Sequence, residues 1–249
     1  YTGTRAVAHG AYTEPSKGGE ISTIGVVPKP TIAVLSSSMN SPSSLGTSRL
    51  NNFVPSADSV SLVPRERWDV EHFRDIYLDN EPASRLVPPH GTFIDNPDMF
   101  DCVIFKVSHS EANVLDVQQR LLMENLLRAR KSIFPVTTFE NSAHSSEITG
   151  VYVGISSTDY LFEHVKPTAT ESNAYILAGN VLSVAAGRLS FIFALRGPSL
   201  ALDTACSSSI VTAHFASKNI LDGEITTAVS AGVSQILSAL VSSLFNTAG

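Results

Sequence analysis

Apolar and β-branched residues gather into short runs along this chain, and polar, Gly-rich or Pro-rich segments separate the runs. Short apolar runs predict buried strands, while apolar residues three or four positions apart predict one face of a helix. The predicted strands are 31–35, 100–107, 150–155, 199–204 and 225–233, and the predicted helices are about 110–130, 173–195 and 206–221. Strands that alternate with helices indicate a layered α/β domain with a buried sheet.

The first 30 residues have a different character. They are rich in Gly, Thr, Ser, Pro and Lys, and they show no sustained periodicity. Such a segment buries too little apolar surface to offset the entropy lost on ordering. We therefore expect 1–30 to be a flexible leader that contributes nothing to the core.

Composition and charge exclude several classes of protein. The chain has 249 residues, 43% of them hydrophobic, and carries 17 Lys and Arg against 23 Asp and Glu, a net charge of −6. Basic residues do not cluster beside aromatics, which argues against nucleic-acid binding. The longest apolar stretch is broken by Ser, Gly and Gln before it reaches the roughly 18 to 20 residues of a membrane span.

The cysteine count indicates a compartment. Cys102 and Cys206 lie far apart in the sequence, so they do not form a disulfide framework, and no histidine pair at ligand spacing suggests a metal site. These features predict a reducing environment, either the cytoplasm or the interior of an organelle.

One cysteine stands at a chemically favourable position. Cys206 follows the apolar run 199–204 and falls in the first turn of the helix predicted for 206–221. The N–H groups at a helix start favour a thiolate, and the backbone N–H of Cys206 can form half of an oxyanion hole when a thioester is attacked. We predict that 199–204 is a buried strand and that the sulfur of Cys206 faces a cavity. Cysteine is also a common buried hydrophobe, so the residue pattern alone leaves both roles open.

A family resemblance favours the reactive role. The motif DTACSSS, residues 203–209, resembles the nucleophile motif of β-ketoacyl synthases, especially the ketosynthase domains of polyketide synthases. Six further blocks resemble the family in the same order: RERWDVEHF (65–73), FIDNPDMFD (93–101), DVQQRLLME (116–124), TGVYVGISSTDY (149–160), AAGRLSFIFALRGPS (185–199) and SAGVSQILSA (230–239). The similarity covers about 31–249. It identifies Cys206 as the residue that matches the family's acyl-accepting nucleophile.

The resemblance implies a fold and a reaction. Family members have a thiolase-like layered fold (αβαβα) made of two related halves, so 31–249 should be the N-terminal half, with a buried mixed sheet, cut before the C-terminal half. The family's cysteine takes an acyl group from the phosphopantetheine of an acyl carrier protein and condenses it with decarboxylated malonyl-carrier protein. The resemblance implies no directly bound cofactor. It also implies a homodimer that pairs through 199–204, and further polyketide synthase domains as partners.

Three functions compete at this stage. The first is a condensing enzyme of polyketide or fatty-acid biosynthesis, and the second is a catalytically impaired partner subunit that contributes only pocket shape or dimer contacts. The third is a thiolase-like acyltransferase that uses free coenzyme A. Impaired partners typically lack the nucleophile, so Cys206 favours an enzyme, and DTACSSS with RGPS and DVQQR resembles the carrier-dependent branch. In the family, two histidines and a lysine from the second half support decarboxylation, and none of the seven histidines here lies in such a motif.

The sequence departs from the family at several places. It has SSSMNSPSS from residue 36 instead of a Cys-Arg-Phe-Pro-like turn, Val117 where a proline is usual, and FKVSHSEANVL in place of a Gly-Ile-Ser-Pro pattern. These changes put loop conformation and partner docking in question more than acylation.

Other residues have simpler interpretations. We expect Cys102 to be an inert thiol in the core, and Asp116 and Arg120 to form an i,i+4 pair that supports a helix. His214, two turns after Cys206, should make a core or interface hydrogen bond. The remaining histidines should be surface or loop residues: His9, His72, His90, His109, His144 and His164.

Overall fold

A computed structural model describes residues 2–8, 32–39, 60–76, 87–133, 147–164 and 175–248. Its centre is a five-stranded sheet with the strand order β2-β1-β7-β5-β6. The strands are β1 (Thr2–Ala8), β2 (Ile32–Met39), β5 (Thr149–Ile155), β6 (Ser199–Leu202) and β7 (Thr227–Val233). β1 is antiparallel to β2 and β7, whereas β5 is parallel to both β6 and β7. The predicted mixed sheet is therefore confirmed.

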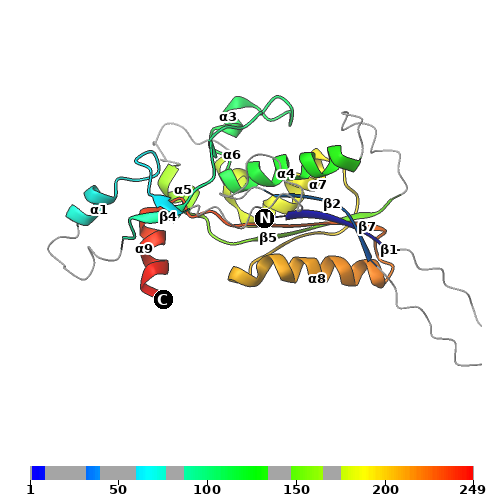
Figure 1. The fold of residues 1–249 in the computed structure, drawn as a ribbon. Helices are drawn as coiled ribbons and strands as arrows, with labels where there is room; N and C mark the ends of the chain where they lie inside the picture. Colours follow the sequence, from blue (N-terminus) through cyan, green and yellow to red (C-terminus); the bar gives the residue numbers. More distant parts are fainter. Residues whose placement is uncertain are drawn as a thin grey trace, which may run out of the picture.

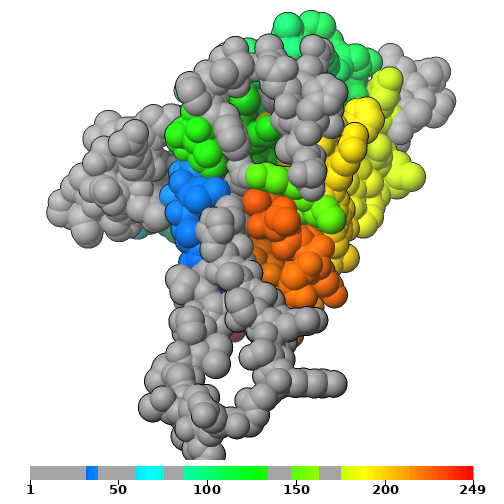
Figure 2. Space-filling model, turned by 90° about the vertical axis from the view of Figure 1, so that its right-hand side faces the viewer, coloured from blue at the N-terminus to red at the C-terminus, as the bar shows by residue number. Residues whose placement is uncertain are grey.

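Helices cover both faces of this sheet (Figure 1). α4 (Val117–Ile133) and α7 (Leu182–Ile192) lie on one face, and α8 (Ser208–Leu221) lies on the other. Figure 2 shows these layers from the side, with the green residues of α4 above the blue residues of β2 and the orange residues around α8 in the lower part. The result is the layered α/β architecture that the alternation of strands and helices predicts.

β5 lies inside the sheet, between β7 and β6, and this position accounts for its apolar sequence. All seven residues of β5 are buried. Val151, Val153 and Ile155 pack in the core cluster that also holds residues of α4 and α7. Tyr152, between them, packs on the opposite face with Ala216 of α8. Because successive side chains of a strand point to opposite faces, a strand covered on both sides becomes continuously apolar.

The other elements lie around this body. A two-stranded antiparallel ladder pairs β3 (Val60–Leu62) with β4 (His90–Thr92). The shorter helices are α1 (Val70–Ile76), α3 (His109–Ala112), α5 (Asp159–His164), α6 (Tyr175–Asn180), the 3-10 turn η3 (Ala205–Ser207) and α9 (Ala239–Ala248). Across the described ranges, none of the helices has both the length and the apolar character needed to cross a membrane.

The leader expected for 1–30 contains a strand. β1 pairs with β2 on one side and with β7 on the other, so the expectation was wrong for Thr2–Ala8. The hydrogen bonds that define β1 come from strands distant in sequence, which local composition does not report. Residues 9–31 lie outside the described residues.

The strand predicted for 100–107 was wrong. This segment is a turn in which the N–H of Val107 donates to the carbonyl of Cys102 over 2.9 Å, and the N–H of Lys106 donates to the carbonyl of Val103 over 3.1 Å. Lys106 has a φ of 55° between them. This is the hydrogen-bond pattern of a Schellman motif, with its one residue in the left-handed region. The apolar run still buries Cys102, Phe105 and Val107, but in a turn and not in a sheet.

Two predicted helices are each divided. The segment 110–130 contains α3 and α4, and 173–195 contains α6 and α7. At the first break, a carboxylate oxygen of Asp116 accepts the backbone N–H of Gln118 over 2.8 Å, which starts α4 as an N-cap does. At the second, Val181 has an extended backbone, with φ −74° and ψ 126°, so the helix stops and restarts.

The strand predicted for 199–204 forms in part, but it is not buried in this chain. β6 spans Ser199–Leu202 and is an edge strand of the sheet, and Leu200 is 42% exposed. An apolar sequence does not distinguish a central strand from an edge strand.

Candidate active site

The carboxyl ends of three parallel strands meet at one edge of the sheet. β5, β6 and β7 run in the same direction, with β5 between the other two. The segments that follow them, 156–158, 203–207 and 234–238, therefore lie along the same edge. Figure 1 shows the start of α8 at this end of the molecule, together with α5 and α9. Ligands of open α/β sheets commonly bind at such an edge.

Cys206 lies in the segment that leaves β6. It is the central residue of η3, which leads directly into α8, so the predicted helix start is confirmed. Its side chain is exposed, unlike that of Cys102. The expected cavity in front of the sulfur stays a prediction. An exposed thiol at the start of a 14-residue helix lies where first-turn N–H groups point outward.

The residue before this cysteine has an unusual backbone. Ala205 has a φ of 55°, which lies in the left-handed region that residues other than glycine rarely adopt. Its N–H donates to a carboxylate oxygen of Asp203 over 2.9 Å, as in an Asx turn. Strained conformations of this kind persist only where the surroundings hold them, and they cluster at functional sites.

The strand β5 closely approaches the start of α8. A Cβ atom built on Gly154 would lie 2.6 Å from the backbone carbon of Ser208 and 2.8 Å from its carbonyl oxygen. Only a glycine permits this approach. Ser208 is the first residue of α8 and lies two residues after Cys206, so this contact with the sheet fixes where α8 begins.

A buried amide joins two of the three segments at this edge of the sheet. Gln118, with none of its surface exposed, donates from Nε2 to the carbonyl of Ser157 over 3.1 Å. Its Oε1 accepts the backbone N–H of Gln235 over 3.3 Å. Gln118 thus connects the segment after β5 to the segment after β7.

A buried carboxylate makes a second connection between the same segments. Asp159 is 5% exposed, and its oxygens accept the hydroxyl of Ser157 over 2.9 Å and the N–H of Leu237 over 2.7 Å. Ser157 has a φ of 86°, so this segment also contains a strained residue. Fully hydrogen-bonded buried polar groups rigidify their surroundings. The segment after β5, which neighbours the strand that leads to Cys206, is therefore held by buried hydrogen bonds.

Asp116 is the most perturbed acid of this region. Burial raises its pKa to about 6, and the negative charge of Asp159 adds to the rise. Hydrogen bonds from the backbone and side chain of Gln118 and the charge of Arg120 act in the opposite direction. The charge of the nearby Asp159 thus disfavours the ionised form of Asp116.

This pKa predicts how stability depends on pH. Because the folded protein holds the Asp116 proton more tightly than the unfolded chain, the stabilisation is complete below about pH 4 and is lost as pH rises through about 6. Asp116→Asn does not ionise. We expect the free energy of unfolding of the wild type, relative to this variant, to fall by roughly 2 to 3 kcal/mol between pH 4 and 7 in urea titrations.

A carboxylate in solvent provides the control for that measurement. Asp222 is paired with Lys218 at the exposed end of α8. Water screens such a pair, so Asp222→Asn should show a much smaller pH-dependent difference. A pH-independent difference for Asp116→Asn would contradict the assignment.

The i,i+4 pair predicted for Asp116 and Arg120 was wrong. Asp116 caps α4, while the guanidinium of Arg120 donates to the carbonyl of Leu115 over 2.8 Å and to the hydroxyl of Tyr160 over 2.9 Å. Both charged residues are buried. The motif DVQQR therefore connects the N-terminal end of α4 to surrounding segments. Its Asp116 and Arg120 do not form an ion pair on an exposed helix surface.

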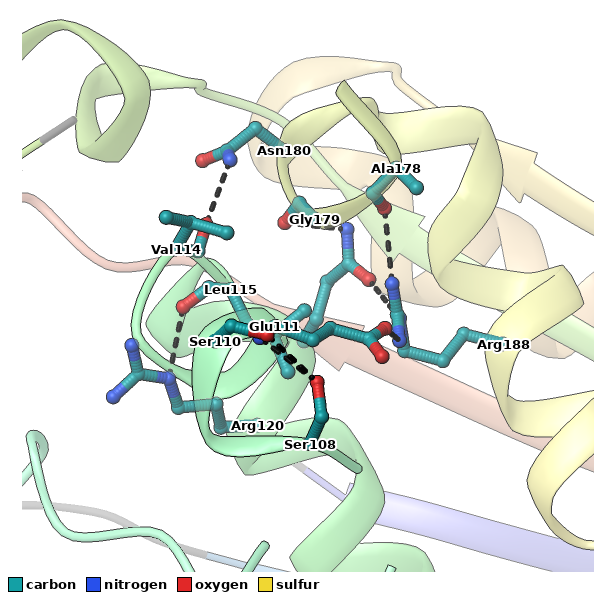
Figure 3. A network of polar contacts seen from close by, with 11 residues as sticks. Ser108, Ser110, Glu111, Val114, Leu115, Arg120, Ala178, Gly179, Asn180 and Arg188 are labelled. Atoms are coloured by element: carbon teal, nitrogen blue, oxygen red, sulfur yellow. Dashed lines mark hydrogen bonds and ion pairs between the residues drawn. The ribbon is translucent and has the colours of Figure 1, made fainter. Parts of the chain in front are cut away.

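A polar network extends from the same motif to the helices of that face (Figure 3). Arg188 of α7 forms an ion pair with Glu111 and donates to the carbonyl of Ala178 over 3.2 Å. The amide of Asn180 donates to the carbonyl of Val114 over 2.9 Å. These contacts join α3 and the start of α4 to α6 and α7, on the side away from α8.

The remaining cysteine and histidines have the following places. Cys102 is buried in the core, as expected, and its sulfur lies 3.5 Å from Nδ1 of His109. His214 is exposed on α8, so a core role was wrong, whereas an interface role stays a prediction. His72 and His90 are exposed, as expected, and so is His109. His9 and His144 lie outside the described residues, as does the side chain of His164.

Sequence reasoning missed several residues of this site. Gly154, Gln118 and Asp159 had no assigned role, although all three lie in family-like blocks. Gly154 follows five buried β5 residues, and a glycine inside a strand pattern is a signal for a close backbone approach. No comparable local signal exists for Gln118, because its partners are 39 and 117 residues away.

The fold and the placement of this cysteine define the thiolase-like class of α/β proteins. The chain belongs to the β-ketoacyl synthase family, since the family model described as "Beta-ketoacyl synthase, N-terminal domain" matches residues 29–249. Among curated relatives it is 38% identical over 180 residues to polyketide synthase GfsE of Streptomyces halstedii. It is 33% identical over 205 residues to a mycocerosic acid synthase-like polyketide synthase of Mycolicibacterium smegmatis. These matches cover 71% and 82% of this chain but only 4% and 9% of the relatives.

Solved ketosynthase structures have the same fold. The oxazolomycin ketosynthase domain from Streptomyces albus superposes with a TM-score of 0.66 at 28% identity, over 80% of this chain and 34% of that domain. The ketosynthase from module 6 of the bacillaene synthase of Bacillus subtilis superposes with a TM-score of 0.62 at 28% identity, over 84% of this chain and 33% of that one. The chain is thus a ketosynthase domain of polyketide synthase type, and it spans about a third of the solved ketosynthases.

Proposed function

We propose that this protein is a condensing enzyme that extends a polyketide or fatty acyl chain, with Cys206 as its acyl acceptor. The observation that carries the proposal is an exposed cysteine in a strained turn, at the start of α8 and at the carboxyl edge of the parallel strands. Nucleophiles that must reach a carrier-bound substrate need this combination of access and rigid support.

The proposed reaction has two steps. In the first, the thiolate of Cys206 attacks the thioester carbonyl of an acyl-phosphopantetheine, the carrier's C–S bond breaks, and the carrier thiol leaves with a proton. In the second, malonyl-carrier protein loses carbon dioxide, and the carbanion formed attacks the acyl carbon on Cys206. The cysteine thiolate leaves, and a 3-oxoacyl group remains on the carrier. First-turn N–H groups of α8 are the proposed stabilisers of the oxyanion in both steps.

Partners follow from this chemistry. The substrates arrive on the phosphopantetheine of an acyl carrier protein, and the reaction uses no cofactor bound directly to this chain. The resemblance assigns support of decarboxylation to two histidines and a lysine of the second half of the fold. The curated relatives are polyketide synthases many times longer than the matched segment, which supports other synthase domains as neighbours. The unpaired thiols Cys102 and Cys206 favour a reducing compartment, the cytoplasm or an organelle interior.

We also propose that β6 pairs with its own copy across a two-fold axis. β6 is an edge strand with Leu200 42% exposed, and Phe191 on the neighbouring helix α7 is 87% exposed. Pairing would satisfy the edge hydrogen bonds and cover this apolar surface. Light scattering after size exclusion should give twice the chain mass for the full-length protein, and Leu200→Lys should shift it toward the monomer. A monomer at micromolar concentration that still condenses its substrates would rule the dimer out.

A condensation assay tests the function. The full-length protein is incubated with an acyl carrier protein loaded with a short acyl group and with malonyl-carrier protein, and the products are read by mass spectrometry. We expect a carrier-bound 3-oxoacyl product two carbons longer and release of carbon dioxide. Acylation of the protein without this product would instead identify a catalytically impaired partner. Transfer from free coenzyme A thioesters alone would identify the thiolase-like alternative.

A further inference from the structure

The turn that carries Cys206 requires something to hold it. Ala205, the residue before the cysteine, has a φ of 55°. For a residue with a side chain, this conformation is less stable than the right-handed region. Thr204 and Cys206 are exposed, so packing around them does not supply the restraint.

The hydroxyl of Ser208 makes two hydrogen bonds across this turn. Its Oγ accepts the backbone N–H of Thr204 over 2.8 Å and donates to the carbonyl of Ala205 over 2.7 Å. One side chain thus contacts the N–H of the residue before Ala205 and the carbonyl of Ala205 itself. Ser208 is 5% exposed, so water does not compete effectively for these bonds.

Ser208 is itself held by the sheet. Its backbone lies so close to β5 that a Cβ on Gly154 would be 2.6 Å from its carbonyl carbon. The connection therefore runs from the fully buried strand β5 through the Ser208 hydroxyl to the turn that presents Cys206. A rigid element placed behind a reactive group is what fixes its geometry.

The adjacent serines are placed differently. Ser207 is exposed, and its hydroxyl donates to the carbonyl and to Oγ1 of Thr204, both over 2.8 Å. Ser209 is exposed on the first turn of α8, and its hydroxyl makes neither of the two bonds made by Ser208. Among the three serines that follow the cysteine, only Ser208 is buried between the turn and the sheet.

We propose that Ser208 is a positioning residue, whose hydroxyl holds Ala205 in the left-handed conformation and so fixes the direction of the Cys206 thiol. The proposal rests on the proposed role of Cys206 as acyl acceptor. Without this hydroxyl the turn relaxes toward right-handed backbone, and the sulfur leaves its position at the sheet edge. A displacement of about 1 Å at a reacting group costs up to roughly 100-fold in rate.

The test uses the full-length protein and a butyryl thioester of pantetheine, with acylation followed by intact mass. We expect Ser208→Ala to lower the maximal acylation rate about 10- to 100-fold, with the half-saturating thioester concentration changed less than about 3-fold. Ser209→Ala, the matched control, should retain the wild-type rate. Adding Ala205→Gly to Ser208→Ala should recover most of the lost rate, because glycine adopts the left-handed region without strain.

Two results would overturn the inference. One is an equal loss in Ser208→Ala and Ser209→Ala, and the other is a loss in Ser208→Ala that Ala205→Gly does not recover. The urea midpoints of all variants show whether a lower acylation rate comes from unfolding. If Ser208→Ala alone is unstable, the double variant with Ala205→Gly keeps the test valid.

Alkylation by iodoacetamide tests the positioning role of Ser208 independently of the proposed role of Cys206 as acyl acceptor. If the wild type is not acylated, the proposed function fails, and the rate of Cys206 alkylation by iodoacetamide becomes the readout. The same order of variants is expected there, because alkylation also depends on how the turn presents the thiol. Equal alkylation rates in all variants would overturn the positioning role by itself.

Discussion

Replacing Cys206 with alanine should lower formation of the 3-oxoacyl product by at least about 1,000-fold, because the acyl group then has no thiol to accept it. The fold should survive, since Cys206 is exposed and its side chain packs in none of the core clusters. Product formation from acyl- and malonyl-carrier proteins, read by mass spectrometry, provides the measurement, with urea unfolding as the check on folding.

The second cysteine supplies the matched control. Cys102 is buried in the core and 3.5 Å from His109. Cys102→Ala should therefore cost stability, of the order of 1 kcal/mol, and leave the condensation rate within about 2-fold. If Cys102→Ala abolished the reaction and Cys206→Ala did not, the assignment of the acyl acceptor would be reversed.

Gly154→Ala should both destabilise the protein and impair Cys206. The new Cβ would lie 2.6 Å from the backbone of Ser208, a distance that real contacts do not show, so β5 and α8 must separate. We expect a loss of about 2 to 3 kcal/mol in the free energy of unfolding. Acylation by the folded fraction should fall about 10- to 100-fold, because the start of α8 presents the thiol. Urea unfolding and acylation rates measure the two effects.

Gly187→Ala provides the comparison. Gly187 lies in α7, is exposed, and has no atom within 4 Å of the position that a Cβ would take. Alanine favours a helix over glycine, so this variant should gain about 0.5 to 1 kcal/mol and keep its acylation rate. A Gly154→Ala protein as stable and as active as Gly187→Ala would contradict the close packing of β5 and α8.

Local patterns predicted the parts of the fold whose signal lies in adjacent residues. β5 and β7 are continuous runs of buried residues, and α8 begins two residues after the start predicted for its helix and ends at the predicted residue. In these segments hydrophobicity, length and flanking turn residues agree with one another.

The errors have a common physical origin. The run 100–107 is as apolar as a strand, but its Lys106 adopts the left-handed region and closes a turn. β1 forms through its pairing with β2 and β7, which come from distant parts of the sequence. The breaks before α4 and α7 depend on a capping side chain and an extended residue that periodicity does not resolve. Each is a tertiary or single-residue effect that overrides local propensity.

The residues of the candidate site also fall into those that the sequence predicts and those that only the structure shows. Cys206 could be predicted from its motif and its position before a helix. The bonds of Ser208 and the left-handed Ala205 involve near neighbours, yet the sequence does not specify the direction of a hydroxyl. Gln118 and Gly154 act through segments far away in the chain, so only the folded structure reveals them.

The most direct test of the central claim is the location of the acyl group. The full-length protein is incubated with a butyryl thioester of pantetheine, digested, and its peptides are read by mass spectrometry. We predict a butyryl adduct on the peptide that contains Cys206 and none on the peptide that contains Cys102. An unmodified Cys206 peptide in a protein that makes the 3-oxoacyl product would contradict the account.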